Sequence, residues 1–184
     1  MKPEIHLDVP GGVKNVLLHC CCAPCSSAIV ECLLDNGVCP TLFFCNPNIY
    51  PREEYERRKA ECIRHAGRLG LDFVDADYDH DGWVAEMRGL ENEPERGARC
   101  LRCFTSTLAS SRWKDLNQIN EAGRAAAIEV PGVDFWEQNW RKGGLQERRR
   151  ELIAEYCFYN QTYCGCEYSL RAAEAYAVSK TAGK

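Results

Sequence analysis

Residues 16–26, VLLHCCCAPCS, decide the fold because a short apolar run here meets four cysteines and a serine. The apolar run is typical of a buried strand, and Ser26, ahead of Ile29 and Leu33, is typical of the first turn of a helix. The cysteines then fall in the turn between strand and helix. In an open α/β sheet such a turn borders the crevice that binds ligands. Helix-end amides lower a cysteine pKa, so this position favours metal ligation or nucleophilic attack.

Length and composition predict one globular domain over residues 1–184, of which 45% are hydrophobic and 27% charged. We expect residues 1–14 to be irregular and residues 171–184 to form a C-terminal helix or tail. The first residues carry Lys2, Glu4 and Asp8, so they lack the apolar core of a signal peptide. No apolar run reaches the roughly 18 residues of a membrane helix. The sequence therefore predicts a cytoplasmic protein without a membrane partner.

Thirteen cysteines are the most unusual feature of the composition. In a reducing cytosol, so many cysteines indicate metal binding or redox chemistry rather than disulfides. The formal net charge of -4 argues against a uniformly basic nucleic-acid binder but leaves local basic patches open.

Helices and strands are predicted to alternate along the chain, which favours a parallel sheet with helical crossovers. Pro51 and Gly70 bound the clearest helix, because proline is tolerated at a helix start and glycine at its end. Strands are expected after the first at residues 41–45, 71–75 and 133–136. Helices are expected at residues 26–35, 52–69, 83–90 and 114–127, and again after Gly144 to about residue 154.

The cysteines fall into three groups and five single residues. The groups are Cys20 to Cys25, the pair Cys100 and Cys103, and the pair Cys164 and Cys166. A C-x-x-C turn directs two sulfurs toward one metal ion or cluster. Single cysteines are usually small buried hydrophobic residues, and we expect this of Cys32, Cys39, Cys45, Cys62 and Cys157.

Several metal and redox sites remain compatible with these groups. Structural zinc could use Cys22 and Cys25 with Cys100 and Cys103, as in a zinc-stabilised RNA-binding module. The surplus of thiolates also suits an iron–sulfur cluster. The motif CAPC after a strand is alternatively typical of a thioredoxin-like dithiol oxidoreductase. The pair Cys164 and Cys166 has the spacing of a strained, easily reduced dithiol. The residues themselves predict a redox protein with a thiolate-bound metal and a separate dithiol.

Several multi-residue blocks, in order, also resemble the QueH type of epoxyqueuosine reductase. They are LLHCCCAPCS (17–26), FFCNPNI (43–49), REEYERR (52–58), GLENEPE (89–95), CLRCF (100–104), residues 115–123 and YNQTYCGCEYS (159–169). The resemblance implies a cytoplasmic enzyme that reduces the epoxide of epoxyqueuosine at the wobble position of tRNA, giving queuosine in the last step of its biosynthesis. It also implies a Rossmann-like, adenine-nucleotide-hydrolase-like three-layer α/β fold and a [4Fe-4S] cluster, with an additional iron in some members.

Carried over by position, the resemblance assigns the cluster to Cys21, Cys22, Cys100 and Cys103. It assigns a redox-active dithiol to Cys164 and Cys166, and Cys25 would hold the additional iron. One departure is that Phe104 runs directly into TSTL, where the family has a further segment of about twenty residues. An electron donor is implied but not identified by the sequence.

The chemistry and the tRNA partner suggest further candidates. A metal beside the cluster could act as Lewis acid, with acid candidates at Asp77, Asp79, His19 and Tyr163. Arginines of residues 52–68 and 141–150 could meet phosphates, and an extruded base could stack on Tyr50, Trp113 or Tyr159. A tRNA-thiolating ATPase of the same general fold is disfavoured, because cysteines occupy the turn where its Ser-Gly-Gly pyrophosphate loop would lie.

Overall fold

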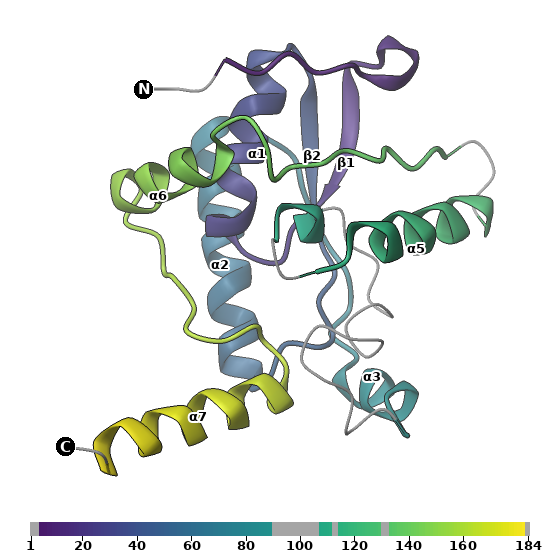
Figure 1. Ribbon diagram of the computed structural model, residues 1–184. Coiled ribbons are helices and arrows are strands. Elements are labelled where there is room, and N and C mark those ends of the chain that lie inside the picture. The colour runs from purple at the N-terminus through teal and green to yellow at the C-terminus, as the bar shows by residue number, and fades with distance from the viewer. Residues whose placement is uncertain (1–3, 90–106, 112–113, 130–132, 183–184) are drawn as a thin grey trace.

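The computed structural model describes residues 4–89, 107–111, 114–129 and 133–182. Three strands form one sheet in the order β1 (Asn15–His19), β2 (Cys39–Phe44) and β3 (Phe73–Asp75). Both neighbouring pairs are parallel, and helices α1 (Ala23–Asp35) and α2 (Arg52–Leu69) connect them (Figure 1). The predicted parallel α/β arrangement, with cysteines following the first strand, is confirmed.

The remaining elements follow the sheet in the chain. The helices are α3 (His80–Glu86), α5 (Leu116–Glu129), α6 (Leu145–Glu155) and α7 (Glu167–Ala182), and 3-10 turns lie at Pro10–Gly12 and Thr107–Ser110. In the part of the chain that the structure describes, no helix is both long enough and apolar enough to span a membrane.

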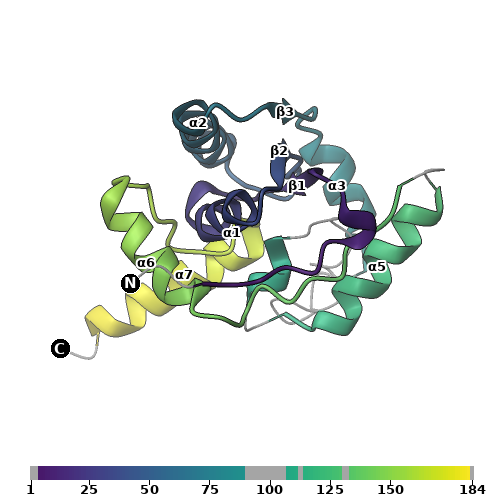
Figure 2. The same cartoon turned by 90° about the horizontal axis from the view of Figure 1, so that it is seen from above.

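The core lies between the sheet and the two crossover helices. Leu18 pairs in register with Leu42, and both side chains are buried together with Phe44. Helices α1 and α2 lie on this side of the sheet, and α5 lies on the other (Figure 2). Leu17, which points away from the buried side, is 63% exposed. Burial on one face thus decides which side chains of each strand point into the core, and the chain leaves β1 at its carboxyl end, where the cysteines lead into α1.

The best-predicted element is α2, whose bounds agree with the sequence pattern. Gly70 ends it in the left-handed conformation, with φ +66°, and its N–H donates to the carbonyls of Ala66 and Gly67. This is the geometry that glycine adopts at little cost.

Three predicted elements need correction. The helix expected at residues 83–90 is α3, which begins at His80, where Asp79 caps it, and ends at Glu86. Helix α1 begins at Ala23 rather than at Ser26, because Pro24 fits its first turn. The strand expected at residues 133–136 was wrong, since this segment forms no strand. Its aromatic residues pack as side chains instead: Phe135 lies against Gly123, where a Cβ atom would collide, and Trp136 meets the edge of Trp140.

Candidate metal and redox site

Three cysteines of the turn after β1 converge at the amino end of α1. The Sγ atoms of Cys21, Cys22 and Cys25 all lie within 4.8 Å of one another, and those of Cys21 and Cys22 are 3.9 Å apart. The strand ends at His19 and the chain bends at Cys21, so the alternation of side chains in a strand no longer separates neighbours. Cys20 does not join them, because it is fully buried and its thiol donates to the Phe43 carbonyl. We call Cys21, Cys22 and Cys25 the cysteine cluster.

Polar donors from three distant segments point at these sulfurs. Gln161 Nε2 lies 3.1 Å from Cys22 Sγ and 3.7 Å from Cys25 Sγ. Arg149 Nη2 lies 3.9 Å from Cys25 Sγ, while its Nε donates to the Pro24 carbonyl. Thr107 Oγ1 lies 3.9 Å from Cys21 Sγ. Donors of this kind stabilise thiolates and tune the reduction potential of thiolate-bound centres.

The three thiols ionise differently. Hydrogen bonds from Cys21 and Cys22 hold the pKa of Cys25 well below its usual range despite burial, with help from the Arg149 charge. Burial and the neighbouring thiols raise the pKa of Cys22 well above its usual range. Hydrogen bonding with Cys22 lowers the pKa of Cys21, but hydrogen bonding with Cys25 and burial outweigh it and raise that pKa. The cluster thus concentrates its negative charge on Cys25, and a bound metal would displace the remaining protons.

The donor set of the cysteine cluster suits a metal. Two thiolates on one tetrahedral ion, with metal–sulfur bonds of about 2.3 Å, lie about 3.8 Å apart. The Cys21–Cys22 separation of 3.9 Å matches this value, so both sulfurs can reach one metal ion without rearrangement. In a [4Fe-4S] cluster each thiolate binds a different iron, so there the two sulfurs would lie farther apart. Soft thiolates favour zinc, copper(I) or iron–sulfur centres over magnesium or calcium. The cluster could therefore hold a metal at the carboxyl end of β1.

Cys164 and Cys166 lie on a separate segment, residues 159–166, which we call the dithiol loop. Cys166 is buried against Trp83 and Met87, and its Sγ lies 3.4 Å from Ser169 Oγ. Cys164 is half-buried. The N–H of Tyr50 donates to the Gly165 carbonyl between them, at 2.8 Å. The two cysteines therefore differ in access, and Cys164 is the more exposed.

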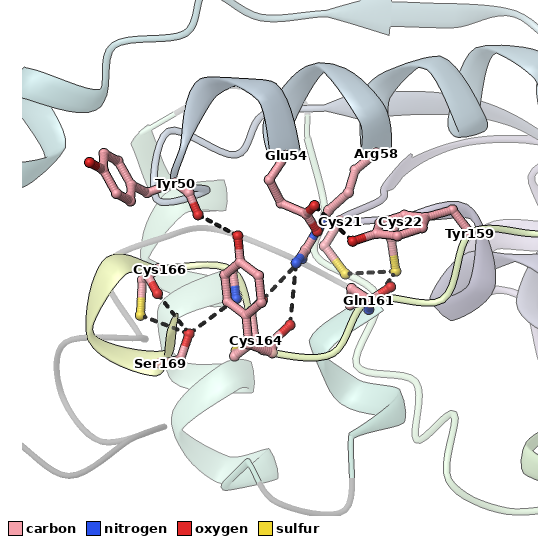
Figure 3. A network of polar contacts seen from close by, with 12 residues as sticks. Cys21, Cys22, Tyr50, Glu54, Arg58, Tyr159, Gln161, Cys164, Cys166 and Ser169 are labelled. Carbon is pink, nitrogen blue, oxygen red and sulfur yellow. Dashed lines mark hydrogen bonds and ion pairs between the residues drawn. The ribbon is translucent and has the colours of Figure 1, made fainter. Parts of the chain in front are cut away.

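An ion pair on α2 connects the dithiol loop to the cysteine cluster (Figure 3). Arg58 donates to Glu54 at 2.7 Å and to the carbonyls of Tyr163 and Cys164 at 3.2 and 3.1 Å. Glu54 in turn accepts the hydroxyl of Tyr159 at 2.8 Å. Gln161 lies between these two attachment points and reaches the sulfurs of the cysteine cluster.

Of the candidates from the sequence, the structure brings Cys21, Cys22 and Cys25 together. Cys100, Cys103 and Trp113 lie outside the described residues. The contacts of Gln161, Arg58 and Arg149 were not predicted. The motif YNQTYCGC marked the neighbourhood of Gln161, but no sequence spacing indicates that a glutamine will contact a cysteine 139 positions earlier.

The four candidates for a proton donor lie in different environments in the structure. Asp79 caps α3 by accepting the Gly82 N–H, which is a structural role, and Asp77 is exposed. His19 is buried, which lowers its pKa to about 4, and its Nε2 pairs with the Cys45 carbonyl. Burial raises the pKa of Tyr163 to about 12, and its hydroxyl donates to the Tyr50 carbonyl. Of the four candidates, Tyr163 is the one that belongs to the dithiol loop, where it directly precedes Cys164.

Two further expectations are only partly met. Among the single cysteines, Cys32 and Cys62 are buried as predicted and Cys45 is partly buried, but Cys39 and Cys157 are exposed. Several arginines expected to face phosphate hold internal partners: Arg58 pairs with Glu54, Arg64 with Glu61, and Arg148 with Glu31, Glu151 and Glu155. A phosphate-facing surface would therefore be smaller than the sequence suggests.

The comparisons with known proteins agree on one family. The model of the family described as epoxyqueuosine reductase QueH matches residues 16–106 and 104–172. A protein of Acinetobacter baylyi named epoxyqueuosine reductase QueH is 42% identical over 198 residues, covering 97% of this chain and 91% of that protein. Proteins of the same name from Histophilus somni and Haemophilus influenzae are each 46% identical over 184 residues, covering 90% of this chain and 76% and 75% of their own lengths.

The same comparisons agree with the departure noted after Phe104. The alignment with the Acinetobacter protein extends over 198 residues although this chain has 184, so that relative carries residues that this chain lacks. The family model matches in two segments that meet at residues 104–106, the predicted place of the missing segment. With both segments matched, and with relatives similar over most of their length, the chain belongs to the epoxyqueuosine reductase QueH family.

Proposed function

We propose that this chain reduces the epoxide of epoxyqueuosine in tRNA to give queuosine, the last step of queuosine biosynthesis. Family membership supports the substrate, and the convergence of Cys21, Cys22 and Cys25 beside the dithiol loop is the observation that carries the chemistry. Removing an epoxide oxygen to leave a carbon–carbon double bond takes up two electrons and two protons and releases water. A site for this reaction must therefore supply both electrons and protons to one bound base.

The metal would be held by the cysteine cluster. Cys21 and Cys22, with Cys100 and Cys103, would ligate a [4Fe-4S] cluster, and Cys25 is available for an additional iron. When bound, these groups would supply one-electron transfer and Lewis-acid activation of the epoxide. Gln161 and Arg149 would stabilise the thiolates by hydrogen bonds, as donors around such centres generally do.

The dithiol loop would supply the electron pair. Oxidation of Cys164 and Cys166 to a disulfide releases two electrons and two protons, which balances the reduction of one epoxide. An electron donor that we have not identified would then restore the two thiols. Tyr163, which precedes Cys164 in the chain, is our preferred proton donor, and its hydroxyl would exchange its bond to the Tyr50 carbonyl for one to the substrate. Persistent thiols of this kind are typical of the reducing cytoplasm, where we place the protein.

The tRNA base would stack beside the dithiol loop on Tyr50. This side chain is 40% exposed, and its ring stacks on His80 with a centroid distance of 5.3 Å. Its N–H bonds to Gly165 and its carbonyl accepts the Tyr163 hydroxyl, so the loop fixes its backbone on both sides. Enzymes that modify a base generally extrude it onto aromatic side chains. Tyr159, which is half-buried under Arg57, is less accessible.

The test is to purify the protein without oxygen, count iron and acid-labile sulfide per chain, and incubate it with tRNA that carries epoxyqueuosine. We expect a brown protein with about four irons and four sulfides, or one iron more, that forms queuosine when reduced. A colourless zinc protein would favour the zinc-stabilised RNA-binding module. A metal-free protein that still exchanges disulfides would favour the thioredoxin-like oxidoreductase. Either result would contradict the proposed reaction.

A further inference from the structure

Arg58 is a charged side chain enclosed by protein. It is 1% exposed and its ion-pair partner Glu54 is 7% exposed. Burying such a pair is costly unless hydrogen bonds satisfy the remaining donors and acceptors. A surface ion pair would avoid this cost, as Arg52 and Glu56 do two residues earlier on α2, with the same spacing and exposures of 68% and 44%. The buried position therefore calls for a reason beyond helix stability.

The other guanidinium nitrogens supply that reason. Nη1 and Nη2 donate to the carbonyls of Cys164 and Tyr163, so one side chain holds two consecutive peptide groups of the dithiol loop. Gly165 makes the approach possible, because a Cβ there would lie 3.1 Å from Nη1 and its φ of +136° suits only glycine. The planar guanidinium is the side chain that can serve Glu54 and both carbonyls together.

The same ion pair also sets the position of Gln161. Glu54 holds Tyr159 on one side of that residue, and Arg58 holds Tyr163 on the other. Gln161 then reaches both Cys22 and Cys25. The cysteine cluster and the dithiol loop, which are far apart in the sequence, are thus connected through the Glu54–Arg58 ion pair.

We propose that Arg58 is a positioning residue that couples the two cysteine groups: its three-way hydrogen bonding holds the dithiol loop against the cysteine cluster. The functional part of this inference rests on the proposed dithiol chemistry, whereas the positioning part can be measured without turnover.

The experiment compares Arg58→Gln, Arg58→Lys and the control Arg52→Gln in protein purified without oxygen. The readouts are the rates at which iodoacetamide alkylates Cys164 and Cys62, followed by mass spectrometry, together with iron per chain. Cys62 is fully buried on α2 and reports general unfolding. In Arg58→Gln we expect alkylation of Cys164 to accelerate about tenfold or more relative to Cys62, because loop opening no longer breaks charge-assisted hydrogen bonds.

Arg58→Lys keeps the positive charge but cannot donate to Glu54 and both loop carbonyls together, so we expect Cys164 to be alkylated faster than in the parent. In Arg52→Gln the alkylation rate of Cys164 should stay within about twofold of that in the parent, because exposed ion pairs contribute little.

Equal acceleration at Cys62 and Cys164, or no acceleration at either, would overturn the inference. If Arg58→Gln does not fold, the ratio of the alkylation rate of Cys164 to that of Cys62 is measured in Arg58→Lys instead, and the same outcomes apply. If Cys164→Ser leaves turnover intact while Arg58→Gln still exposes Cys164, the dithiol chemistry is wrong and the positioning role stands.

Discussion

The cysteine cluster and the dithiol loop reach their positions by different means. The cluster is local: a strand, a bend and a helix start bring Cys21, Cys22 and Cys25 together within five residues of chain. The dithiol loop is held from outside, by Arg58 and Glu54 of α2, which precede it by more than a hundred residues. Local geometry tolerates changes elsewhere in the molecule, whereas the loop depends on a few long-range contacts. Substitutions should therefore separate the two regions.

The largest effect is expected from Cys22→Ser, which removes a sulfur from the cluster. Losing an outer-shell partner typically costs a metal site 10- to 100-fold, so losing this thiolate should lower metal affinity or turnover by about 100-fold or more. The dithiol loop should keep its structure, so alkylation of Cys164 should change little. Iron analysis checks the first expectation, with the exposed Cys39→Ser as control. Full metal retention in Cys22→Ser would remove this residue from the site.

Glu54→Ala should destabilise the protein next most strongly, because it leaves Arg58 buried without its carboxylate. Breaking a buried ion pair from one side costs about 3–5 kcal/mol. Glu56→Ala removes the exposed partner of Arg52 and should cost less than about 1 kcal/mol. Urea unfolding of both variants measures the difference. Equal costs would mean that the buried pair does not anchor the loop.

A change of pH should also act on the segment that leads into the dithiol loop. His65 of α2 is buried edge-on against Tyr156 and Phe158, and burial, with the charges of Arg64 and Arg68, lowers its pKa to about 4. The unfolded chain takes up this proton near pH 6.5 and the folded chain only near pH 4, so stability falls as the pH drops through that window.

His65→Leu should flatten that part of the stability profile by about 2 kcal/mol, since each unit of pKa difference corresponds to about 1.4 kcal/mol. Urea unfolding at pH 7, 6, 5 and 4.5 checks this. An unchanged slope in the variant would show that other groups set the acid sensitivity.

Gln161→Met tests the contact between the two regions with the smallest change of shape. It removes the donor to Cys22 and Cys25 but keeps a side chain of similar length. We expect metal affinity to fall about 10-fold, the lower end of outer-shell effects, with little loss of stability. Competition with a chelator measures the affinity. An affinity equal to that of the parent would show that the hydrogen bonds to sulfur have no effect on the metal.

The two regions also differ in how far the sequence predicts them. The apolar run, the C-x-x-C spacing and the helix signals predict a cysteine-lined turn at a strand end, because each signal acts over a few residues. The bounds of α2 follow from Pro51 and Gly70 for the same reason. The strand expected at residues 133–136 was wrong because the aromatic side chains of Phe135 and Trp136 pack against Gly123 and Trp140 without a neighbouring strand.

The roles of Arg58 and Gln161 needed the structure. In the sequence, Arg58 is one of six basic residues on an exposed-looking helix, and Gln161 is a polar residue in a loop. Only tertiary packing determines that Arg58 faces inward and that Gln161 contacts cysteine sulfurs near the other end of the chain. The resemblance of the YNQTYCGC block to the family indicated that this segment matters, but it did not predict the contacts that the segment makes.

The most direct test of the joint action of the two regions is a single turnover without oxygen and without added reductant. Protein reduced beforehand and freed of reductant is mixed with tRNA that carries epoxyqueuosine, and mass spectrometry follows both the base and the thiols. We expect up to one queuosine per chain, matched by loss of the thiols of Cys164 and Cys166 to a disulfide. Queuosine formed while both thiols remain reduced would contradict the proposed dithiol chemistry.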